Sequence, residues 1–242
     1  MSYCGLDADC ILYRVGTKPM PPRVPTLRQS LFIGGLGFGL VGLTAFAVWA
    51  FAGGMLTRAV GEGGFYAVCA AVFIGLAGLV FGQLVIGPGG TVRMYALFTP
   101  AFLAYSALWC AAWFALARRT GWLGGELSAE LLGAAVGGVA MAAVMARAFG
   151  ATHQFGRGAL ALFAGNSLGY FLGKVVWQWL RGEGATIFAG ILTHEQRGWL
   201  AMLAWGLLYG ACFGAAIGYV IFLCQKRVRD KLRNGIPLPS GP

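Results

Sequence analysis

The chain has 242 residues, of which 58% are apolar and 11% charged. A soluble domain usually carries about 25% charged residues, so this composition excludes an ordinary soluble protein. The net charge of +10 would indicate a nucleic-acid partner in a soluble protein. Here we assign the Lys and Arg residues to helix ends and tails, where they set orientation and contact anionic lipid headgroups, and we expect no nucleic-acid partner.

Residues 1–30 form a polar tail before the first apolar run, which starts near Leu31. Four prolines hold its second half extended, which favours a stiff lead-in to the membrane over a segment that clips onto a partner. Cys4 and Cys10 share this tail at a spacing that differs from the common zinc motifs. The first apolar run is too long for a signal peptide, so we interpret it as a retained span.

Apolar runs of about 20 residues, each long enough to cross a hydrocarbon core of about 30 Å, recur along the chain. The sequence therefore predicts an all-α, polytopic integral membrane protein with six transmembrane helices in a glycine-rich bundle. The predicted spans cover residues 31–53, 65–86, 94–117, 127–149, 159–180 and 199–224. Residues 185–192 are apolar but too few to span, so we expect them to lie at the interface. Residues 226–242 form a basic tail.

Small residues at every fourth position let helix backbones approach closely in a membrane. The longest such row is in the sixth span, a second is in the fifth, and a pair is in the first. Their glycines are Gly206, Gly210, Gly214 and Gly218; Gly165, Gly169 and Gly173; and Gly35 and Gly39. We expect these glycines to pack helices, and we expect the rows of the fifth and sixth spans to face each other.

Six spans place both termini on the same side, and the basic residues predict that this side is the cytoplasm. The cytoplasmic segments then hold 12 Lys and Arg residues and the outer segments 5, as the positive-inside rule requires. All eight Trp residues fall in the outer half under this topology. Arg118 and Arg119 run against the charge rule. We expect a bacterial inner membrane, with an organelle inner membrane as the alternative.

Polar groups within the spans are the candidate functional residues. Lys174 lies about two turns from the outer end of the fifth span, where a long stem can reach the headgroups, and we favour this interpretation over a coupling site. Asn166 and Ser167 are mid-span, and we favour hydrogen bonding between helices over contact with a substrate. His153 and His194 lie in loops on opposite sides of the membrane, so they cannot bind one metal together; a single axial ligand to a haem or pigment is the less favoured alternative.

The third span lacks glycine and is rich in aromatic residues, of which Phe102, Tyr105, Trp109 and Trp113 are candidates for a partner-facing surface. Glu126 and Glu130 lie in the first turn of the fourth span, where negative charge complements the helix dipole. The run Gly34–Gly39 lies inside a span and does not follow a strand, so it is not a dinucleotide loop. The sequence identifies no metal site and no cofactor; bound lipid or pigment stays open.

Three functions remain. A non-catalytic structural or accessory subunit of a larger membrane assembly, such as a photosynthetic or respiratory complex, is favoured by the low intramembrane charge and the packing motifs. Its partners are then other membrane subunits. A small transporter or channel for a neutral or apolar solute is the alternative, although the two halves of the chain do not repeat each other. An intramembrane enzyme has least support, because no nucleophile–base pair is evident.

Overall fold

The computed structural model describes residues 24–87, 89–117, 119, 125–182, 184–188 and 190–234. Over these residues the protein is all helical, without strands. The elements are α2 (Leu27–Phe32), a π-helical turn (Ile33–Gly37), α3 (Phe38–Gly82), α4 (Gly90–Leu116), α5 (Glu126–Ala148), a short 3₁₀ helix (Thr152–Gln154), α6 (Phe155–Arg181), α7 (Gly184–Ile187), α8 (His194–Cys224) and α9 (Lys226–Arg233). Cys4, Cys10, Arg118 and Trp122 lie outside the described residues.

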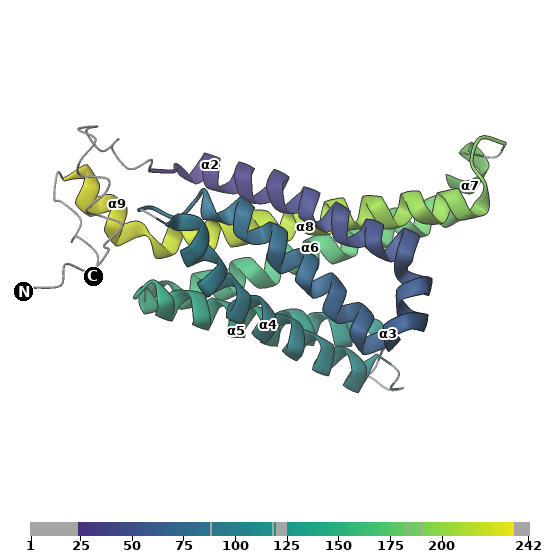
Figure 1. Cartoon of the computed structure of the whole chain (residues 1–242), viewed down its shortest axis with the longest axis horizontal. Coiled ribbons are helices and arrows are strands. Elements are labelled where there is room, and N and C mark those ends of the chain that lie inside the picture. The colour runs from purple at the N-terminus through teal and green to yellow at the C-terminus, as the bar shows by residue number, and fades with distance from the viewer. Residues whose placement is uncertain are drawn as a thin grey trace, which may run out of the picture.

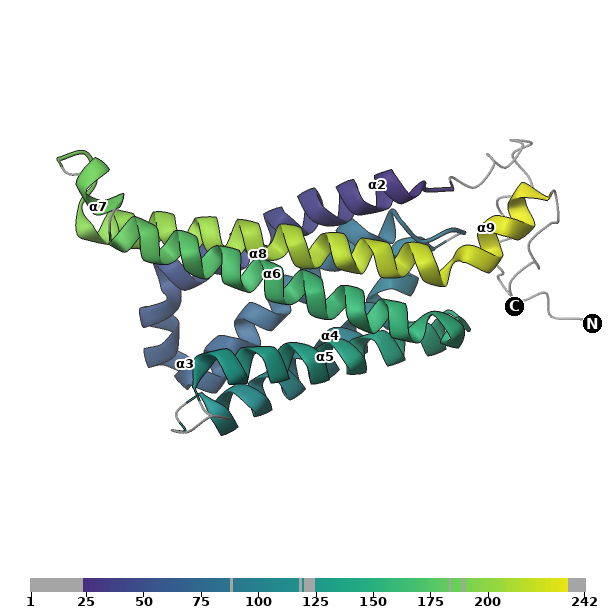
Figure 2. The same ribbon diagram turned by 180° about the vertical axis from the view of Figure 1, so that it is seen from behind.

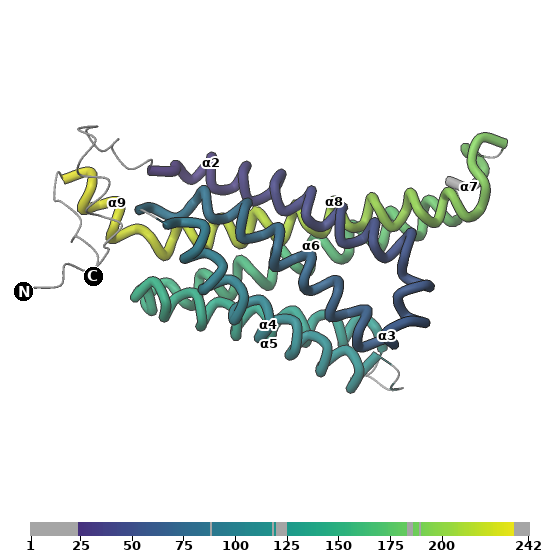
Figure 3. The backbone as a smooth tube through the Cα atoms, viewed as in Figure 1, coloured from purple at the N-terminus to yellow at the C-terminus, as the bar shows by residue number. Residues whose placement is uncertain are grey.

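Five helical segments are long and apolar enough to cross a membrane, and the first of them, Leu27–Gly82, is 56 residues long. This segment folds back on itself, because Gly61 adopts a left-handed conformation with φ +74° that interrupts the helix. Figure 3 shows the resulting path, in which two long arms are joined by a bend. The first arm comprises residues 27–53 and the second arm residues 65–82. The first two predicted spans are therefore both helical, and the connection between them is mostly helical too.

The first arm begins four residues earlier than predicted, because Thr26 caps α2. The Thr26 hydroxyl accepts a hydrogen bond of 3.2 Å from the Gln29 backbone N–H, and the Gln29 side chain accepts one of 3.0 Å from the Thr26 N–H. This reciprocal pair satisfies donors that the start of a helix otherwise leaves free. The first eight residues of the predicted basic tail form the helix α9.

Helix α8 lies between the first arm and α6, as Figure 2 shows from behind. Helix α5 packs against α4 and α6, and α4 packs against the α3 segment. Side chains fill the space enclosed by these helices. Four phenylalanines form the centre of this core and have no exposed surface: Phe38, Phe81, Phe98 and Phe213.

The long glycine row of α8 faces the first arm. A β-carbon at Gly214 would fall on the carbonyl oxygen of Gly34, and one at Gly206 would lie 2.6 Å from the carbonyl oxygen of Gly42. Gly210 and Gly218 meet the first arm in the same way, at Phe38 and Ser30. The expectation that this row faces the glycine row of the fifth span is therefore wrong.

The glycine row of α6 instead contacts the opposite side of α8. A β-carbon at Gly165 would lie 2.8 Å from the carbonyl oxygen of Cys212, and one at Gly169 would lie 2.9 Å from the Tyr209 Cα. Gly173 accommodates the indole of Trp205. Gly35 and Gly39 have looser contacts, because a β-carbon at either position would lie no closer than 3.4 Å to Ala211 or Leu207. Helix α8 thus has close contacts on two sides. Its own glycines face the first arm, and the glycines of α6 face its opposite side.

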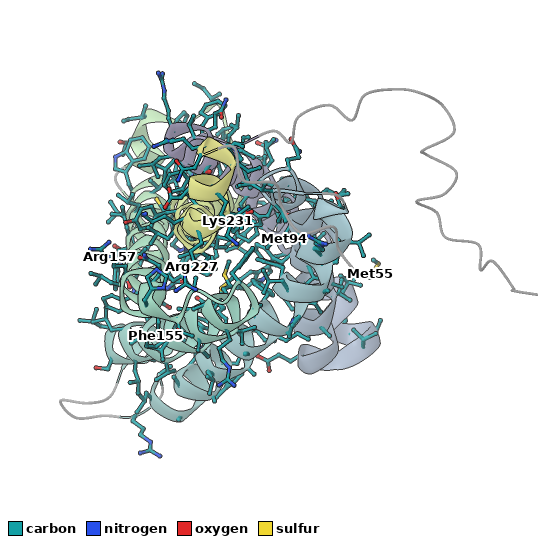
Figure 4. All side chains as sticks on the ribbon, turned by 90° about the vertical axis from the view of Figure 1, so that its left-hand side faces the viewer. Met55, Met94, Phe155, Arg157, Arg227 and Lys231 are labelled. Carbon is teal, nitrogen blue, oxygen red and sulfur yellow. The ribbon has the colours of Figure 1, made fainter. Side chains whose placement is uncertain are left out.

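The two ends of the bundle differ in charge. The start of α2 and the helix α9 lie at one end, and α7 lies at the other (Figure 1). Among the described residues, the α9 end carries nine basic side chains and one acidic side chain, Asp230. The basic residues are Arg28, Arg93, Arg147, Arg157, Lys226, Arg227, Arg229, Lys231 and Arg233. Figure 4 looks onto this end and labels Arg157, Arg227 and Lys231.

The α7 end is nearly balanced in charge and is rich in tryptophan. In the described part of the chain it holds five basic residues, Arg58, Arg119, Lys174, Arg181 and Arg197, and four acidic ones, Glu62, Glu126, Glu130 and Glu195. All seven tryptophans that the structure describes lie in the halves of their helices nearer to this end.

Candidate functional site

A cluster of polar side chains lies inside the bundle, centred on Glu130. This glutamate has no exposed surface, although it is only in the second turn of α5. Its Oε2 accepts a hydrogen bond of 3.0 Å from the indole Nε1 of Trp109. Its Oε1 accepts one of 2.7 Å from the amide Nδ2 of Asn166. Both carboxyl oxygens therefore have a donor from another helix.

Asn166 extends the cluster to a fourth helix. Its Oδ1 accepts a hydrogen bond from the hydroxyl of Tyr105 and another, of 3.0 Å, from the hydroxyl of Tyr209. The two hydroxyl oxygens are 3.3 Å apart. We call these five residues, Trp109, Tyr105, Glu130, Asn166 and Tyr209, the buried polar cluster. It joins α4, α5, α6 and α8 at one point.

The local sequence explains how the cluster assembles. Tyr105 and Trp109 are four residues apart on α4, so their polar tips lie on the same side of that helix. Opposite them, α5 presents Gly133 and Gly137. A β-carbon at Gly133 would come within 2.8 Å of the Trp109 ring, and one at Gly137 within 2.8 Å of the Tyr105 ring. The glycines therefore admit two large rings beside the carboxyl group.

An ion pair lies next to the cluster, nearer to the surface. Lys174 Nζ donates a hydrogen bond of 2.6 Å to Glu126 Oε2, and the two side chains are 30% and 60% exposed. Glu126 is one turn before Glu130 on α5, and Lys174 is two turns after Asn166 on α6. The antiparallel helices α5 and α6 thus form two contacts: the ion pair Lys174–Glu126 near the α7 end, and the fully buried hydrogen bond Asn166–Glu130 further inside.

Aromatic packing surrounds the polar cluster. The rings of Trp109 and Trp113 stack with centroids 5.2 Å apart, and Tyr105 packs on Phe213 at 5.0 Å. Phe102 and Tyr105, which the sequence suggested for a partner-facing surface, are instead buried, at 6% and 4% exposed. Trp109 and Trp113 are half-buried. The face that holds Phe102 and Tyr105 therefore packs within the chain.

The other candidates lie apart from the cluster. Ser167 is next to Asn166, but its hydroxyl has no partner among the described residues. His153 is exposed in the 3₁₀ helix before α6, and His194 is exposed at the start of α8, where its Nε2 lies 3.2 Å from Arg181 Nη2. Since α6 and α8 begin at opposite ends of the bundle, these two histidines are far apart. No group of three or more His, Cys, Asp or Glu side chains in the described ranges could hold a metal ion.

The burial of Glu130 is the feature that reasoning from the sequence missed. Glu130 was interpreted with Glu126 as a charge near a helix start. The sequence next to Glu130 indicates burial, because the flanking residues are apolar: Ala129, Leu131, Leu132 and Gly133. A carboxyl group in such a context requires hydrogen-bond donors from other helices. The sequence does not reveal which helices supply them.

The chemistry of the cluster follows from its groups. A carboxyl, an amide, two phenols and an indole can link helices through hydrogen bonds, or hold a proton on the carboxyl group.

No protein-family model, curated protein or solved structure matches this chain.

Proposed function

We propose that this protein is a non-catalytic structural or accessory subunit of a larger membrane assembly, of the kind found in photosynthetic or respiratory complexes. The observation that carries the proposal is the closure of the buried polar cluster. Both oxygens of Glu130, the amide oxygen of Asn166 and the indole N–H of Trp109 all have partners within it. A substrate site would present free polar groups to a cavity, whereas a closed network holds helices in one arrangement.

The close contacts of α8 support the same proposal. Its backbone touches the first arm at four of its own glycines and touches α6 at Gly165 and Gly169, while Gly173 of α6 accommodates the Trp205 side chain. The core between the helices is filled by aromatic rings that have no exposed surface. Close-packed interiors resist continuous deformation, so this bundle is suited to be a rigid scaffold.

We further propose that the chain crosses the membrane six times, with the α9 end in the cytoplasm. The excess of basic residues at that end agrees with the positive-inside rule, and the tryptophans near the other end agree with an interfacial belt. A bacterial inner membrane is the setting that we favour, with an organelle inner membrane as the alternative.

Single-cysteine labelling in intact cells tests the proposed orientation, with the α9 end in the cytoplasm. A cysteine in the 3₁₀ helix before α6 should be protected, and one in the turn after α7 should react.

A transporter is the second candidate, and the burial of Glu130 favours it. Acidic side chains inside membrane bundles are rare and often mark ion pathways. A buried acidic residue was not expected with a neutral or apolar solute, and Glu130 is such a residue. Proton coupling through Glu130 is then the mechanism to test.

Extraction in a mild detergent, followed by mass spectrometry of co-purifying proteins, tests the first proposal. We expect stoichiometric membrane partners, and a monodisperse monomer would contradict the accessory role.

Reconstitution into vesicles with an internal pH dye tests the second candidate, the transporter. Proton entry under an imposed potential that disappears in Glu130→Gln would favour transport. Equal, background-level entry in both proteins agrees with a scaffold.

A further inference from the structure

A groove at the α9 end combines basic and apolar side chains. It measures about 480 Å³ and lies between the segment that leads into α2 and the helix α9. The apolar part of its lining comes mainly from Val24, Leu27, Phe222 and Leu232, and its basic part from Arg229 and Arg233. Val24 and Leu27 are 40% and 39% exposed, so apolar surface is open there.

Arg229 is held in place at the wall of this groove. Its guanidinium group lies 3.5 Å from the centre of the Phe222 ring, and its Nη1 donates a hydrogen bond to the Phe222 carbonyl oxygen near the end of α8. A guanidinium group has five N–H donors, so this bond leaves others for an anion. The cation is therefore positioned before any ligand arrives.

The other four cations of α9 differ in their surroundings. Lys226 is already paired with Asp230, at 2.6 Å. Arg233 lines the groove and donates no hydrogen bond to any residue that the structure describes. Arg227 and Lys231 are exposed and do not line the groove. Two cations out of five are thus directed to one place, beside apolar side chains.

We propose that this groove binds one anionic glycerophospholipid, with its phosphate between Arg229 and Arg233 and its glycerol and upper acyl chains on Val24, Leu27 and Leu232. The charge of the lining favours an anion, and the apolar half favours a ligand with hydrocarbon next to that anion. The groove lies where α2 begins and α8 ends, which is the depth of the headgroups if these helices span a membrane. The proposal rests on the membrane location and is independent of the accessory role.

The lipid is a better fit than the chain's own N-terminal segment. Residues 1–23 carry Asp7 and Asp9 against Arg14, Lys18 and Arg23, so this segment has an excess of basic residues. A basic segment does not complement the guanidinium groups of Arg229 and Arg233, whereas an anionic phosphate does.

The experiment compares two double variants of the full-length protein in a neutral detergent. Arg229→Gln/Arg233→Gln removes the cations of the groove, and Arg227→Gln/Lys231→Gln removes the same charge from the same helix outside it. Phosphatidylglycerol and phosphatidylcholine with the same acyl chains are titrated, and bound lipid is counted by native mass spectrometry.

We expect wild-type protein to retain one phosphatidylglycerol in preference to phosphatidylcholine. The groove variant should bind it more than tenfold more weakly, since it lacks both cations that face the phosphate, and the control variant should change affinity less than threefold. Arg233→Gln alone keeps the contact of Arg229 with Phe222, so it should weaken binding without disturbing α9.

Three results would overturn the proposal. Equal weakening in both double variants would indicate diffuse surface charge. Equal binding of phosphatidylcholine would show that the phosphate and glycerol groups of an anionic lipid are not recognised. Displacement of phosphatidylglycerol by an equal concentration of inorganic phosphate would identify a site for soluble anions.

Discussion

Asn166 donates a hydrogen bond of 2.7 Å from its Nδ2 to Glu130 Oε1, and this bond joins α6 to α5 where neither side chain has any exposed surface. Each residue also has partners on a further helix, so neither is satisfied by the other alone. A polar group buried without a partner costs more than the bond itself contributes. The stability of the bundle should therefore respond strongly to changes at these two positions.

Glu130→Ala should destabilise the protein by about 1–3 kcal/mol, because the N–H groups of Trp109 and Asn166 lose their acceptor. Glu130→Gln should cost less, since an amide of the same shape keeps one acceptor oxygen. Thermal unfolding in detergent measures both, and the midpoint should fall by roughly 2–4 °C for each kcal/mol. Identical midpoints for Glu130→Ala and wild type would show that the cluster does not hold the helices.

Gly210→Ala should disturb the contact between α8 and the first arm, because the new β-carbon would fall on the carbonyl oxygen of Phe38. Overpacking of this kind costs about 1–3 kcal/mol. Gly198→Ala is the matched control on the same helix, since nothing lies within 4 Å of a β-carbon there. The midpoint of thermal unfolding should fall for Gly210→Ala alone. A control variant that loses as much stability would exclude a specific contact.

Reversing the charge of Lys174 tests the ion pair with Glu126. Lys174→Glu should destabilise the protein, and the double change Lys174→Glu/Glu126→Lys should restore most of the loss. The coupling energy should be about 0.2–1 kcal/mol, because both side chains are partly exposed and water screens the pair. A double-mutant cycle on thermal unfolding measures it. Strict additivity of the two single changes would mean that the contact contributes nothing.

Acidification should loosen α9. A hydrogen bond from Lys226 Nζ, with the positive charge of the same group, holds the pKa of the Asp230 carboxyl below its usual value of 3.8. A lowered pKa adds stability above 3.8 that is lost as the pH falls through the lower, folded value. Protection factors for hydrogen exchange in α9 should therefore drop below about pH 4 in wild type and stay constant in Asp230→Asn. The same drop in that variant would assign the effect to another group.

Much of the helical layout could be predicted from the sequence. Runs of about 20 apolar residues indicate which segments form helices long enough for a membrane, since the pattern depends only on local composition. All six predicted spans are helical over most of their length. The helices α4, α6 and α8 begin four or five residues before the predicted spans, and α8 is capped there by Thr193. In the first segment, the cap at Thr26 and the left-handed Gly61 decide where the helix starts and where it turns back.

The partners of each helix face could not be predicted in the same way. Glycine rows on two helices look equivalent in the sequence, and only the packed bundle decides that the row of α8 meets the first arm while the row of α6 meets the other side of α8. Glu130 is the clearest case. Its sequence position marks a helix start, but its burial depends on Trp109 and Asn166, which lie 21 and 36 residues away along the chain. Local composition sets which segments are helices, whereas long-range contacts decide which polar groups they must bury together.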